Sequence, residues 1–227
     1  MNIAIIAAAG SGNRMGSDQP KQFLPIAGTP IIFRTLNVFE QCASIQEVIV
    51  VLPAQYSADF LAIAGKFGLR KLSRVVPGGK TRAESVKRGL LSIRGTTAEI
   101  VAVHDAVRPF VTVEEIDQTV SAAKEKGAAV LVAQVVDTVK TVNEGFVINT
   151  LDRNECRNAL TPQCFRYDLL RRAYDSADVS DPRLTDDSAL VENLGVSVAV
   201  VEGSAKNIKI TTQRDLALAE ALLRQEE

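Results

Sequence analysis

Short apolar segments alternate with amphipathic segments along nearly the whole chain. Two of the apolar segments, EVIVVL at Glu47–Leu52 and IVAVH at Ile100–His104, are short and rich in β-branched residues. Such segments are typical of strands that are covered on both faces. Because strand and helix patterns alternate, we expect an α/β fold with a mostly parallel sheet, helices on both faces and ligands bound beyond the carboxyl ends of the strands.

The same periodicity predicts the individual elements. Strands are predicted at Ile3–Ala8, Glu47–Leu52, Ser73–Val76, Ile100–His104, Ala128–Val135, Val196–Val201 and Asn207–Ile210. Helices are predicted at Pro30–Gln41, Ser57–Phe67, Arg82–Ile93, Val113–Lys126, Tyr167–Ala177, Asp186–Leu194 and Gln213–Gln225. The sequence contains no internal repeat, linker or low-complexity tract, so residues 1–227 are expected to form one domain.

One segment departs from the alternation. Val135–Val142 and Phe146–Leu151 flank Asn143-Glu144-Gly145, a three-residue turn that contains glycine, and this pattern predicts a β-hairpin within residues 135–153. An isolated pair of strands is only marginally stable in water, so the hairpin should pack on something. It is expected either to extend an edge of the main sheet or to form an arm that contacts a second subunit.

The composition narrows the class of protein. Of 227 residues, 46% are hydrophobic, and 26 basic residues balance 27 acidic ones. This balance argues against a general nucleic-acid binder, so phosphate chemistry would need a local cluster of cations.

No apolar run approaches the roughly 18–20 residues that cross a membrane, and the N-terminus lacks the pattern of a signal peptide. Three cysteines without a C-x-x-C motif predict free thiols and a cytoplasmic protein. A single histidine, His104, excludes zinc sites that need two or three imidazoles.

A glycine-rich loop follows the first predicted strand. Gly10, Gly12 and Gly16 are spaced G-x-G-x-x-x-G, and the second strand does not end in an acidic residue, so a nicotinamide dinucleotide site is disfavoured. Backbone amides in such a loop can nevertheless converge on phosphate oxygens. Arg14 and Lys21 supply two cations close by. The loop therefore indicates either a polyphosphate site or an ordinary strand-to-helix turn with solvated cations.

Seven motifs occur in an order that resembles one enzyme family. They are AAAGSGNRMGSDQPKQFLPIAGTPI near the N-terminus, PGGKTRAESV at Pro77–Val86, VHDAVRPFV at Val103–Val111, VVDTVK at Val135–Lys140, LTPQCF at Leu160–Phe165, LTDDSALVE at Leu184–Glu192 and EGSAKNIKITT at Glu202–Thr212. The first resembles the nucleotidyltransferases that activate sugar and polyol phosphates. The ordered set resembles the 2-C-methyl-D-erythritol 4-phosphate cytidylyltransferase family from residue 3 to about residue 220.

The resemblance implies a fold and a reaction. The fold would be Rossmann-like, a doubly wound sheet of the nucleotide-diphospho-sugar transferase type with an inserted hairpin arm. The reaction would transfer a cytidylyl group from CTP to 2-C-methyl-D-erythritol 4-phosphate, giving CDP-methylerythritol and pyrophosphate in non-mevalonate isoprenoid precursor synthesis. The resemblance also implies a magnesium ion (Mg2+) held mainly through the CTP phosphates rather than by protein ligands, and a homodimer. No nucleic acid or membrane partner is expected.

The resemblance also assigns residues to roles. Arg14 and Lys21 would stabilise the transition state. The residues implied in nucleotide binding are Ala8, Ala9, Gly10, Gly12, Gly78, Gly79, Arg82 and Ser85. Those implied in binding the polyol phosphate are Asp105, Arg108, Thr138, Arg153 and Lys209, with Arg153 reaching from the arm into the partner's site.

The local sequence leaves other interpretations open. Arg82 and Ser85 are also typical of an ordinary helix start, and Asp105 with Arg108 of a structural ion pair. Lys209 alternates with apolar neighbours and faces either solvent or the site. Three rival functions remain: the same transfer to another polyol phosphate such as ribitol 5-phosphate, a dinucleotide-dependent oxidoreductase, and a silent nucleotide-binding protein.

Several polar residues are expected to be structural rather than catalytic. A phosphate nucleophile needs no side-chain nucleophile, so positioning and electrostatic stabilisation are the expected mode of catalysis. We therefore interpret His104 as a hydrogen-bonded structural group. Asp186 and Asp187 are expected in the first turn of a helix, where carboxylates favour the helix dipole, and a metal-binding role is the less favoured alternative. Cys156 and Cys164 are expected to be small buried residues.

Overall fold

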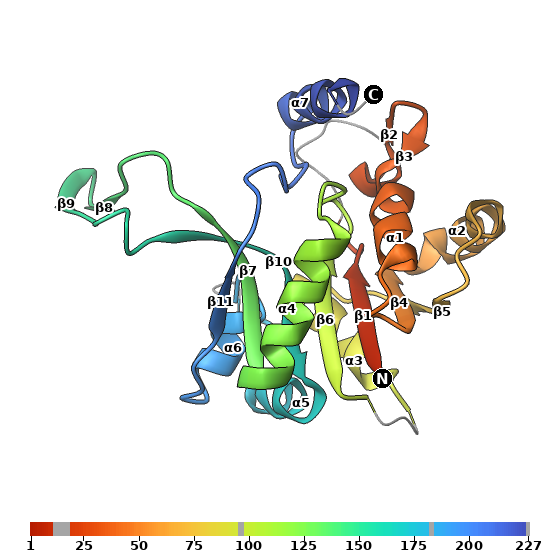
Figure 1. Ribbon diagram of the computed structural model, residues 1–227, viewed down its shortest axis with the longest axis horizontal. Coiled ribbons are helices and arrows are strands. Elements are labelled where there is room, and N and C mark those ends of the chain that lie inside the picture. Colours follow the sequence, from red (N-terminus) through yellow and green to blue (C-terminus); the bar gives the residue numbers. More distant parts are fainter. Residues whose placement is uncertain (11–18, 95–97, 182–183, 226–227) are drawn as a thin grey trace.

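A seven-stranded sheet lies at the centre of the part of the chain that the computed structural model describes, residues 1–10, 19–94, 98–181 and 184–225 (Figure 1). In spatial order its strands are β11 (Ala199–Glu202), β7 (Ala128–Gln134), β10 (Arg157–Arg166), β6 (Ile100–Asp105), β1 (Asn2–Ala7), β4 (Glu47–Leu52) and β5 (Leu72–Pro77). Only β10 runs antiparallel to its neighbours β6 and β7, while the other pairs in this sheet are parallel. The expected α/β fold with a mostly parallel sheet is thus confirmed.

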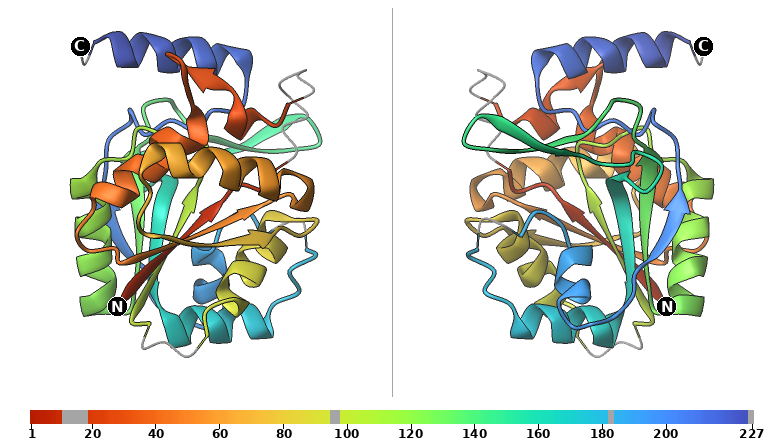
Figure 2. Two further views of the ribbon diagram at one scale, coloured as in Figure 1. Left: turned by 90° about the vertical axis from the view of Figure 1, so that its right-hand side faces the viewer. Right: turned by 90° about the vertical axis from the view of Figure 1, so that its left-hand side faces the viewer.

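Helices cover both faces of the sheet (Figure 2). One face is covered by α1 (Ile31–Gln41), α2 (Ser57–Ala64) and α4 (Val113–Lys126). The other is covered by α3 (Arg82–Leu91), α5 (Tyr167–Ser176) and α6 (Ser188–Glu192). The last helix, α7 (Gln213–Arg224), packs near the short strands β2 (Pro25–Ile26) and β3 (Thr29–Pro30). Short 3-10 helices occur at Lys21–Phe23 (η2), Ala54–Tyr56 (η3) and Gly65–Phe67 (η4).

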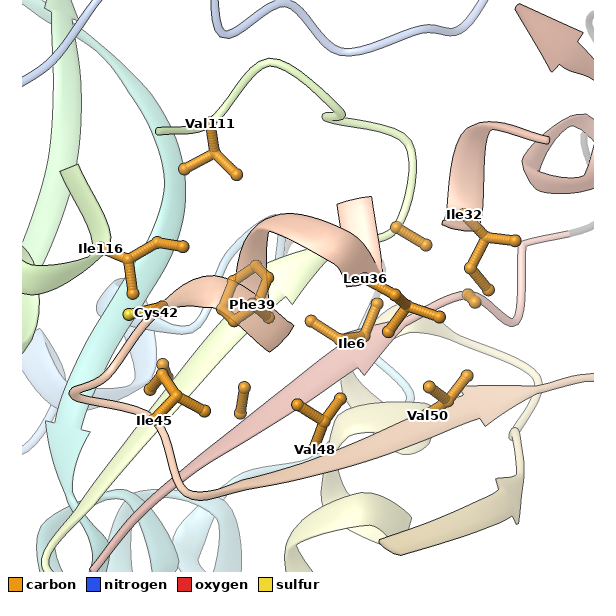
Figure 3. Close-up of a cluster of buried hydrophobic side chains, with 14 of the residues drawn as sticks. Ile6, Ile32, Leu36, Phe39, Cys42, Ile45, Val48, Val50, Val111 and Ile116 are labelled. Carbon is orange, nitrogen blue, oxygen red and sulfur yellow. The ribbon is translucent and has the colours of Figure 1, made fainter. Parts of the chain in front are cut away.

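Strand β1 shows how the alternation of side chains builds two cores. Ala4 and Ile6 belong to the cluster beneath α1 and α4, whereas Ile3 and Ile5 belong to the cluster beneath α3 and α5. All four side chains are fully buried, because successive residues of a strand point to opposite faces and both faces are covered. Figure 3 shows the first cluster, in which α1 contributes its apolar stripe and the strands contribute their side chains from below.

The central strand β10 was not predicted from the sequence. Its segment RNALTPQCFR contains Pro162, and proline lacks the amide that a central strand needs. The structure accommodates the proline with an irregularity in the pairing to β7, which shifts register between Ala159 and Gln163. Conversely, the strand predicted at Asn207–Ile210 was wrong, because those residues form no regular strand. The segment is held at the sheet end by a backbone hydrogen bond from Ile210 to the Val107 carbonyl at 2.9 Å and by side-chain bonds, among them one from Asn207 to the Thr161 carbonyl at 3.0 Å.

The predicted hairpin forms a separate arm rather than an edge of the main sheet. Its strands β8 (Lys140–Asn143) and β9 (Phe146–Thr150) pair with each other and project from the body of the molecule (Figure 1). Left-handed backbone at Glu144 and Gly145 closes the turn. Phe146 is 75% exposed and Ile148 is 65% exposed. The arm therefore presents apolar side chains that the described residues of its own chain do not cover.

Candidate active site

A cavity of about 470 Å³ opens at the carboxyl ends of β1 and β6. In this sheet the chain goes from β1 to β4 on one side and later to β6 on the other, so β1 borders the point where the strand order reverses. Ligands of open α/β sheets bind at such a point. The described residues that line the cavity are Ala7, Ala8, Ala9, Gly10, Lys21, Gln22, Gly79, Lys80, Thr81, Arg82, Ser85, Asp105, Val107 and Lys209.

One wall of the cavity is the start of α3. Thr81 caps this helix by accepting a hydrogen bond from the Glu84 amide at 3.0 Å. Ser85 donates its hydroxyl to the Thr81 carbonyl at 2.8 Å and accepts from the Gly79 amide at 3.0 Å. The loop before α3 is thereby folded onto the first turn, so that Arg82 and Ser85 both line the cavity.

Glycine at position 78 is required by close packing. A Cβ atom on Gly78 would overlap the Cβ atom of Ala9 and would approach the Ser85 hydroxyl to 3.2 Å. The Gly78 amide donates to the Leu52 carbonyl at 2.9 Å, which fixes the loop at the end of β4. Gly78 itself does not line the cavity but allows the loop to lie against Ala9, which does. The result is a narrow floor made of backbone and small side chains.

Gln22 also lines the cavity, although the sequence motifs assigned it no role. Its side chain is 1% exposed, and its amide donates to the Ala8 carbonyl at 2.6 Å and to the Gly10 carbonyl at 3.4 Å. These bonds attach η2, which carries Lys21, to the start of the glycine-rich loop. A single glutamine in a polar stretch gives no periodic signal in the sequence. Only the folded structure shows that Gln22 anchors η2 to the glycine-rich loop.

Asp105 is the centre of a buried charge cluster at the end of β6. Its Oδ1 lies 3.0 Å from Arg82 Nε, and its Oδ2 lies 2.8 Å from Lys209 Nζ. Burial alone would raise the pKa of Asp105, but Arg82 and Lys209 outweigh burial and hold that pKa well below its usual range. The carboxylate is therefore ionised at neutral pH. Three cations (Arg82, Arg108 and Lys209) face two carboxylates (Asp105 and Asp187), so positive charge remains for an anionic ligand.

Arg108 connects this cluster to a second cavity. Its Nε lies 3.7 Å from Asp105 Oδ2, and its Nη1 donates to the Asn207 carbonyl at 2.7 Å. It lines a neighbouring cavity of about 460 Å³ that also borders the root of the arm at Val136 and Asp137. Arg108 Nε has no hydrogen-bond partner within the described ranges. Burial, the largest influence, lowers the pKa of Arg108 from its ordinary value, although the neighbouring Asp105 opposes this.

His104 has the structural environment that the sequence analysis expected. It is fully buried, with Nε2 3.1 Å from the Arg108 carbonyl and Nδ1 3.0 Å from the Thr161 hydroxyl. The carbonyl can only accept, so Nε2 carries the proton and Nδ1 accepts from Thr161. Burial lowers the pKa of His104 to about 4. Both ring nitrogens of His104 are hydrogen-bonded and the residue is absent from the described lining of both cavities, so it supports the strand end.

Comparison with known proteins identifies the family. The family model for 2-C-methyl-D-erythritol 4-phosphate cytidylyltransferase matches residues 2–225. The chain belongs to this cytidylyltransferase family. It is 42% identical over 223 residues to the curated cytidylyltransferase of Pelotomaculum thermopropionicum, covering 97% of this chain and 93% of the relative. It is 43% identical over 223 residues to that of Geobacillus kaustophilus, covering 97% and 96%.

Solved structures of the cytidylyltransferase family agree with this assignment of the chain to the family. The structure of 4-diphosphocytidyl-2C-methyl-D-erythritol synthase from Anaerococcus prevotii matches with a TM-score of 0.86 at 32% identity, covering 98% of this chain and 96% of that chain. The cytidylyltransferase structure from Thermus thermophilus matches with a TM-score of 0.78 at 36% identity, covering 97% and 98%. These matches confirm the fold class and the prediction of a nucleotidyltransferase. They do not favour the rival polyol phosphates or the oxidoreductase interpretation.

The structure brings together most of the residues that the resemblance named. Those that line the first cavity are Ala8, Ala9, Gly10, Lys21, Gly79, Arg82, Ser85, Asp105 and Lys209. Thr138 and Arg153 lie on the arm, both are exposed, and neither is among the described residues lining that cavity. Arg153 donates instead to the Val136 carbonyl at 3.0 Å. Gly12 and Arg14 lie outside the described residues.

Other predictions concern metals, membranes and cysteines. Within the described residues, no cluster of three or more histidine, cysteine or acidic side chains is arranged to hold a metal ion. Over the same residues, none of the helices has the length and apolar character needed to cross a membrane. All three cysteines are free, and Cys42 and Cys164 are buried. Cys156 is only partly buried, so the prediction that it is a buried residue was wrong.

Proposed function

We propose that the cavity at the carboxyl ends of β1 and β6 is the active site, in which the chain transfers a cytidylyl group from CTP to 2-C-methyl-D-erythritol 4-phosphate. The supporting observation is the arrangement around Asp105. A floor of glycine and alanine backbone, suited to a flat base, lies next to a buried carboxylate that is surrounded by Arg82, Lys209 and Arg108. Such a site combines a place for a nucleotide with cations for a second phosphate.

The nucleotide is assigned to the side of the cavity formed by the two glycine loops. Ala8, Ala9 and Gly10 on one side and Gly79 with Ser85 on the other offer backbone groups at close range. Gly12 is proposed to bind the triphosphate. Arg14 and Lys21 are the two cations proposed to stabilise charge that develops in the transition state.

The polyol phosphate is assigned to the opposite side, between the two cavities. Lys209 and Arg108 are the cations that would bind its phosphate, and Asp105 is the acceptor for its hydroxyl groups. The ionised state of Asp105 suits this role, because a carboxylate that stays deprotonated accepts hydrogen bonds at every physiological pH. Thr138 is proposed to complete this subsite from the arm.

The reaction needs no side-chain nucleophile. A phosphate oxygen of the polyol phosphate attacks the α-phosphorus of CTP, a new P–O bond forms, and the bond from the α-phosphorus to the bridging oxygen breaks to release pyrophosphate. The chain has to hold two anions in line against their repulsion. Lys21, Arg82 and Lys209 around one cavity provide this electrostatic stabilisation.

We assign the magnesium ion to the phosphates of CTP rather than to a protein cage. Asp105 is the only carboxylate among the described residues that line the cavity, and Arg82 and Lys209 already occupy its oxygens. This donor set fits a cation that keeps several waters and is bound mainly through substrate phosphates. When bound there, the ion supplies neutralisation of the phosphate charge.

We also propose that the single nucleotidyltransferase domain, residues 1–227, forms a homodimer through the arm at residues 135–153. The hairpin pairs only with itself among the described residues and exposes Phe146, Val147 and Ile148. A two-stranded hairpin with an uncovered apolar face is marginal in water, so a second copy is the natural cover. Arg153 is then proposed to act in the partner's site.

A pyrophosphate-release assay tests the assignment of substrates. Four nucleoside triphosphates are crossed with 2-C-methyl-D-erythritol 4-phosphate and ribitol 5-phosphate at matched magnesium. We expect CTP with methylerythritol phosphate to give the highest kcat/KM. A purine nucleotide as the best donor would overturn the cytidine assignment, and faster reaction with ribitol 5-phosphate would overturn the acceptor assignment.

A further inference from the structure

Asp187 is a buried carboxylate that lies outside the cavity and is connected to it through Arg82. It is fully buried at the start of α6 and is absent from the described lining of the cavity. Its Oδ1 accepts a hydrogen bond from the Tyr174 hydroxyl of α5, and its Oδ2 lies 2.8 Å from Arg82 Nη2 of α3. One carboxylate therefore joins the three helices that cover the same face of the sheet.

Arg82 is held by two carboxylates through two different nitrogens. Its Nε lies 3.0 Å from Asp105 Oδ1, and its Nη2 lies 2.8 Å from Asp187 Oδ2. The guanidinium is planar and rigid, so contacts at two separate nitrogens determine the orientation of the whole group. With Asp105 as its only partner, the group could turn about that single contact.

Asp187 is itself anchored to the central sheet. Gln163 of β10 is 1% exposed and accepts hydrogen bonds from the amides of Asp187 and Ser188, each at 2.9 Å. The Gln163 amide also donates to Asp186 Oδ2 at 2.9 Å. The ring of Tyr174 is fully buried as well. Asp187, which contacts Arg82, and Tyr174, which contacts Asp187, therefore both have fixed positions.

Stability alone does not account for this carboxylate. Burying a charge requires removal of its water, and apolar side chains of similar size often stabilise a core as well or better. Asp105 already provides Arg82 with a counter-charge. What the second carboxylate adds is a defined orientation of an arginine that lines the cavity.

We infer that Asp187 and Tyr174 are positioning residues for cytidylyl transfer, which hold the Arg82 guanidinium in the orientation that serves the nucleotide. This inference rests on the proposed assignment of Arg82 to nucleotide binding. Neither Asp187 nor Tyr174 touches the substrates, so both act through Arg82. Their loss should weaken nucleotide binding more than it slows the chemical step.

Two variants test the inference with little change in volume. Asp187→Asn removes the charge that faces Arg82, and Tyr174→Phe removes only the hydroxyl. We expect Asp187→Asn to raise the KM for CTP about tenfold, as loss of one charge-assisted contact would. Tyr174→Phe should raise the KM for CTP about threefold, because one hydrogen bond to Asp187 is lost. In both variants kcat should fall by a smaller factor than the KM for CTP rises. Tyr167→Phe, on the same helix without contact to Asp187, is the matched control and should leave the KM for CTP unchanged.

A double-mutant comparison shows whether the effect passes through Arg82. Asp187→Asn is measured again in an Arg82→Gln background, with thermal unfolding recorded for every variant. In the Arg82→Gln background we expect Asp187→Asn to have almost no further effect on the KM for CTP, because the arginine that Asp187 orients is gone. An equal rise in both backgrounds would overturn the inference.

The remaining outcomes separate this inference from the proposed function. If Arg82→Gln leaves the KM for CTP unchanged, the assignment of Arg82 to the nucleotide fails. If Arg82→Gln raises that KM but Asp187→Asn and Tyr174→Phe do not, the assignment stands and the positioning role is wrong. Should Asp187→Asn fail to fold, Tyr174→Phe decides, because its ring keeps the packing of the core.

Discussion

Lys209 Nζ and Asp105 Oδ2 lie 2.8 Å apart, and they join the end of β6 to the irregular segment that follows β11. Asp105 is buried, whereas the Lys209 side chain is 40% exposed and lines the cavity. The pair thus fixes a cation at the cavity wall while leaving part of it accessible. This is the arrangement expected for a side chain that binds a phosphate.

Replacement of Lys209 should affect the polyol phosphate rather than the fold. We expect Lys209→Ala to lower kcat/KM for methylerythritol phosphate by roughly tenfold to a hundredfold, since a charge-assisted contact is lost. The free energy of unfolding should change by less than about 1 kcal/mol, because the Lys209 side chain is partly exposed and the buried Asp105 keeps Arg82 as its counter-charge. Steady-state kinetics and urea unfolding measure the two effects. Lys206→Ala, an exposed lysine on the same segment that does not line the described cavity wall, is the control, and equal losses in both variants would contradict the assignment.

The proposed transition-state cations should act on turnover. We expect Lys21→Ala and Arg14→Ala each to lower kcat by about a hundredfold or more, because preorganised charges are worth most where charge develops. Lys66→Ala, a lysine outside the described lining of the cavity, should retain normal turnover. Rates under saturating CTP and magnesium provide the measurement. Unchanged turnover in both variants would refute the catalytic role.

A shared active site would be revealed by complementation. If Arg153 acts in the partner's site, then mixing inactive Arg153→Ala subunits with inactive Lys209→Ala subunits should restore activity. In a heterodimer, one site of the two would then contain both intact residues, so recovery should approach about half of the wild-type rate. The measurement is activity after subunit exchange, with heterodimers purified by two different tags.

The arm provides the control for this experiment. Phe146→Glu places a charge on the exposed apolar face of β9 and should abolish both the dimer mass in light scattering and the complementation. Verified heterodimers that show no recovery would argue against a site built from two subunits.

His104 should make stability depend on pH. Its pKa is lowered to about 4 in the folded chain and is about 6.5 in the unfolded chain, so the unfolded state binds the proton more readily between these values. Stability is therefore full above about pH 6.5 and is lost as the pH falls towards 4. The expected loss from this group between pH 7 and pH 5 is roughly 2 kcal/mol.

Urea unfolding at several pH values measures this dependence. In His104→Gln the slope between pH 6.5 and pH 5 should flatten, even if the variant is less stable overall. An unchanged slope in the variant would show that other groups cause the acid sensitivity. The pKa of Asp105 lies below its usual range. Its contribution to the free energy of unfolding is therefore lost only at a pH below the range in which His104 acts, as the carboxylate becomes protonated.

Local signals were sufficient for some elements and failed for others. The strand at Glu47–Leu52 and the helix at Val113–Lys126 were predicted with the bounds that the structure has, because each pattern is strongly periodic or bounded by a cap. Strand β10 was missed because Pro162 interrupts its pattern. The strand predicted at Asn207–Ile210 is absent, because side-chain contacts of Asn207 and Lys209 and a backbone hydrogen bond to Val107 hold this segment instead of a ladder. Tertiary packing decided both cases.

The sequence by itself determined the class of fold, the family and most residues of the proposed site, since these depend on periodicity and on ordered motifs read along one chain. Only the tertiary structure decided that the hairpin stands apart from the sheet, that Gln22 anchors the glycine-rich loop, and that Asp187 reaches Arg82. These relationships join groups brought together by folding. Ion pairs and hydrogen bonds depend on distances of a few ångströms in space, and separation along the chain does not encode such distances.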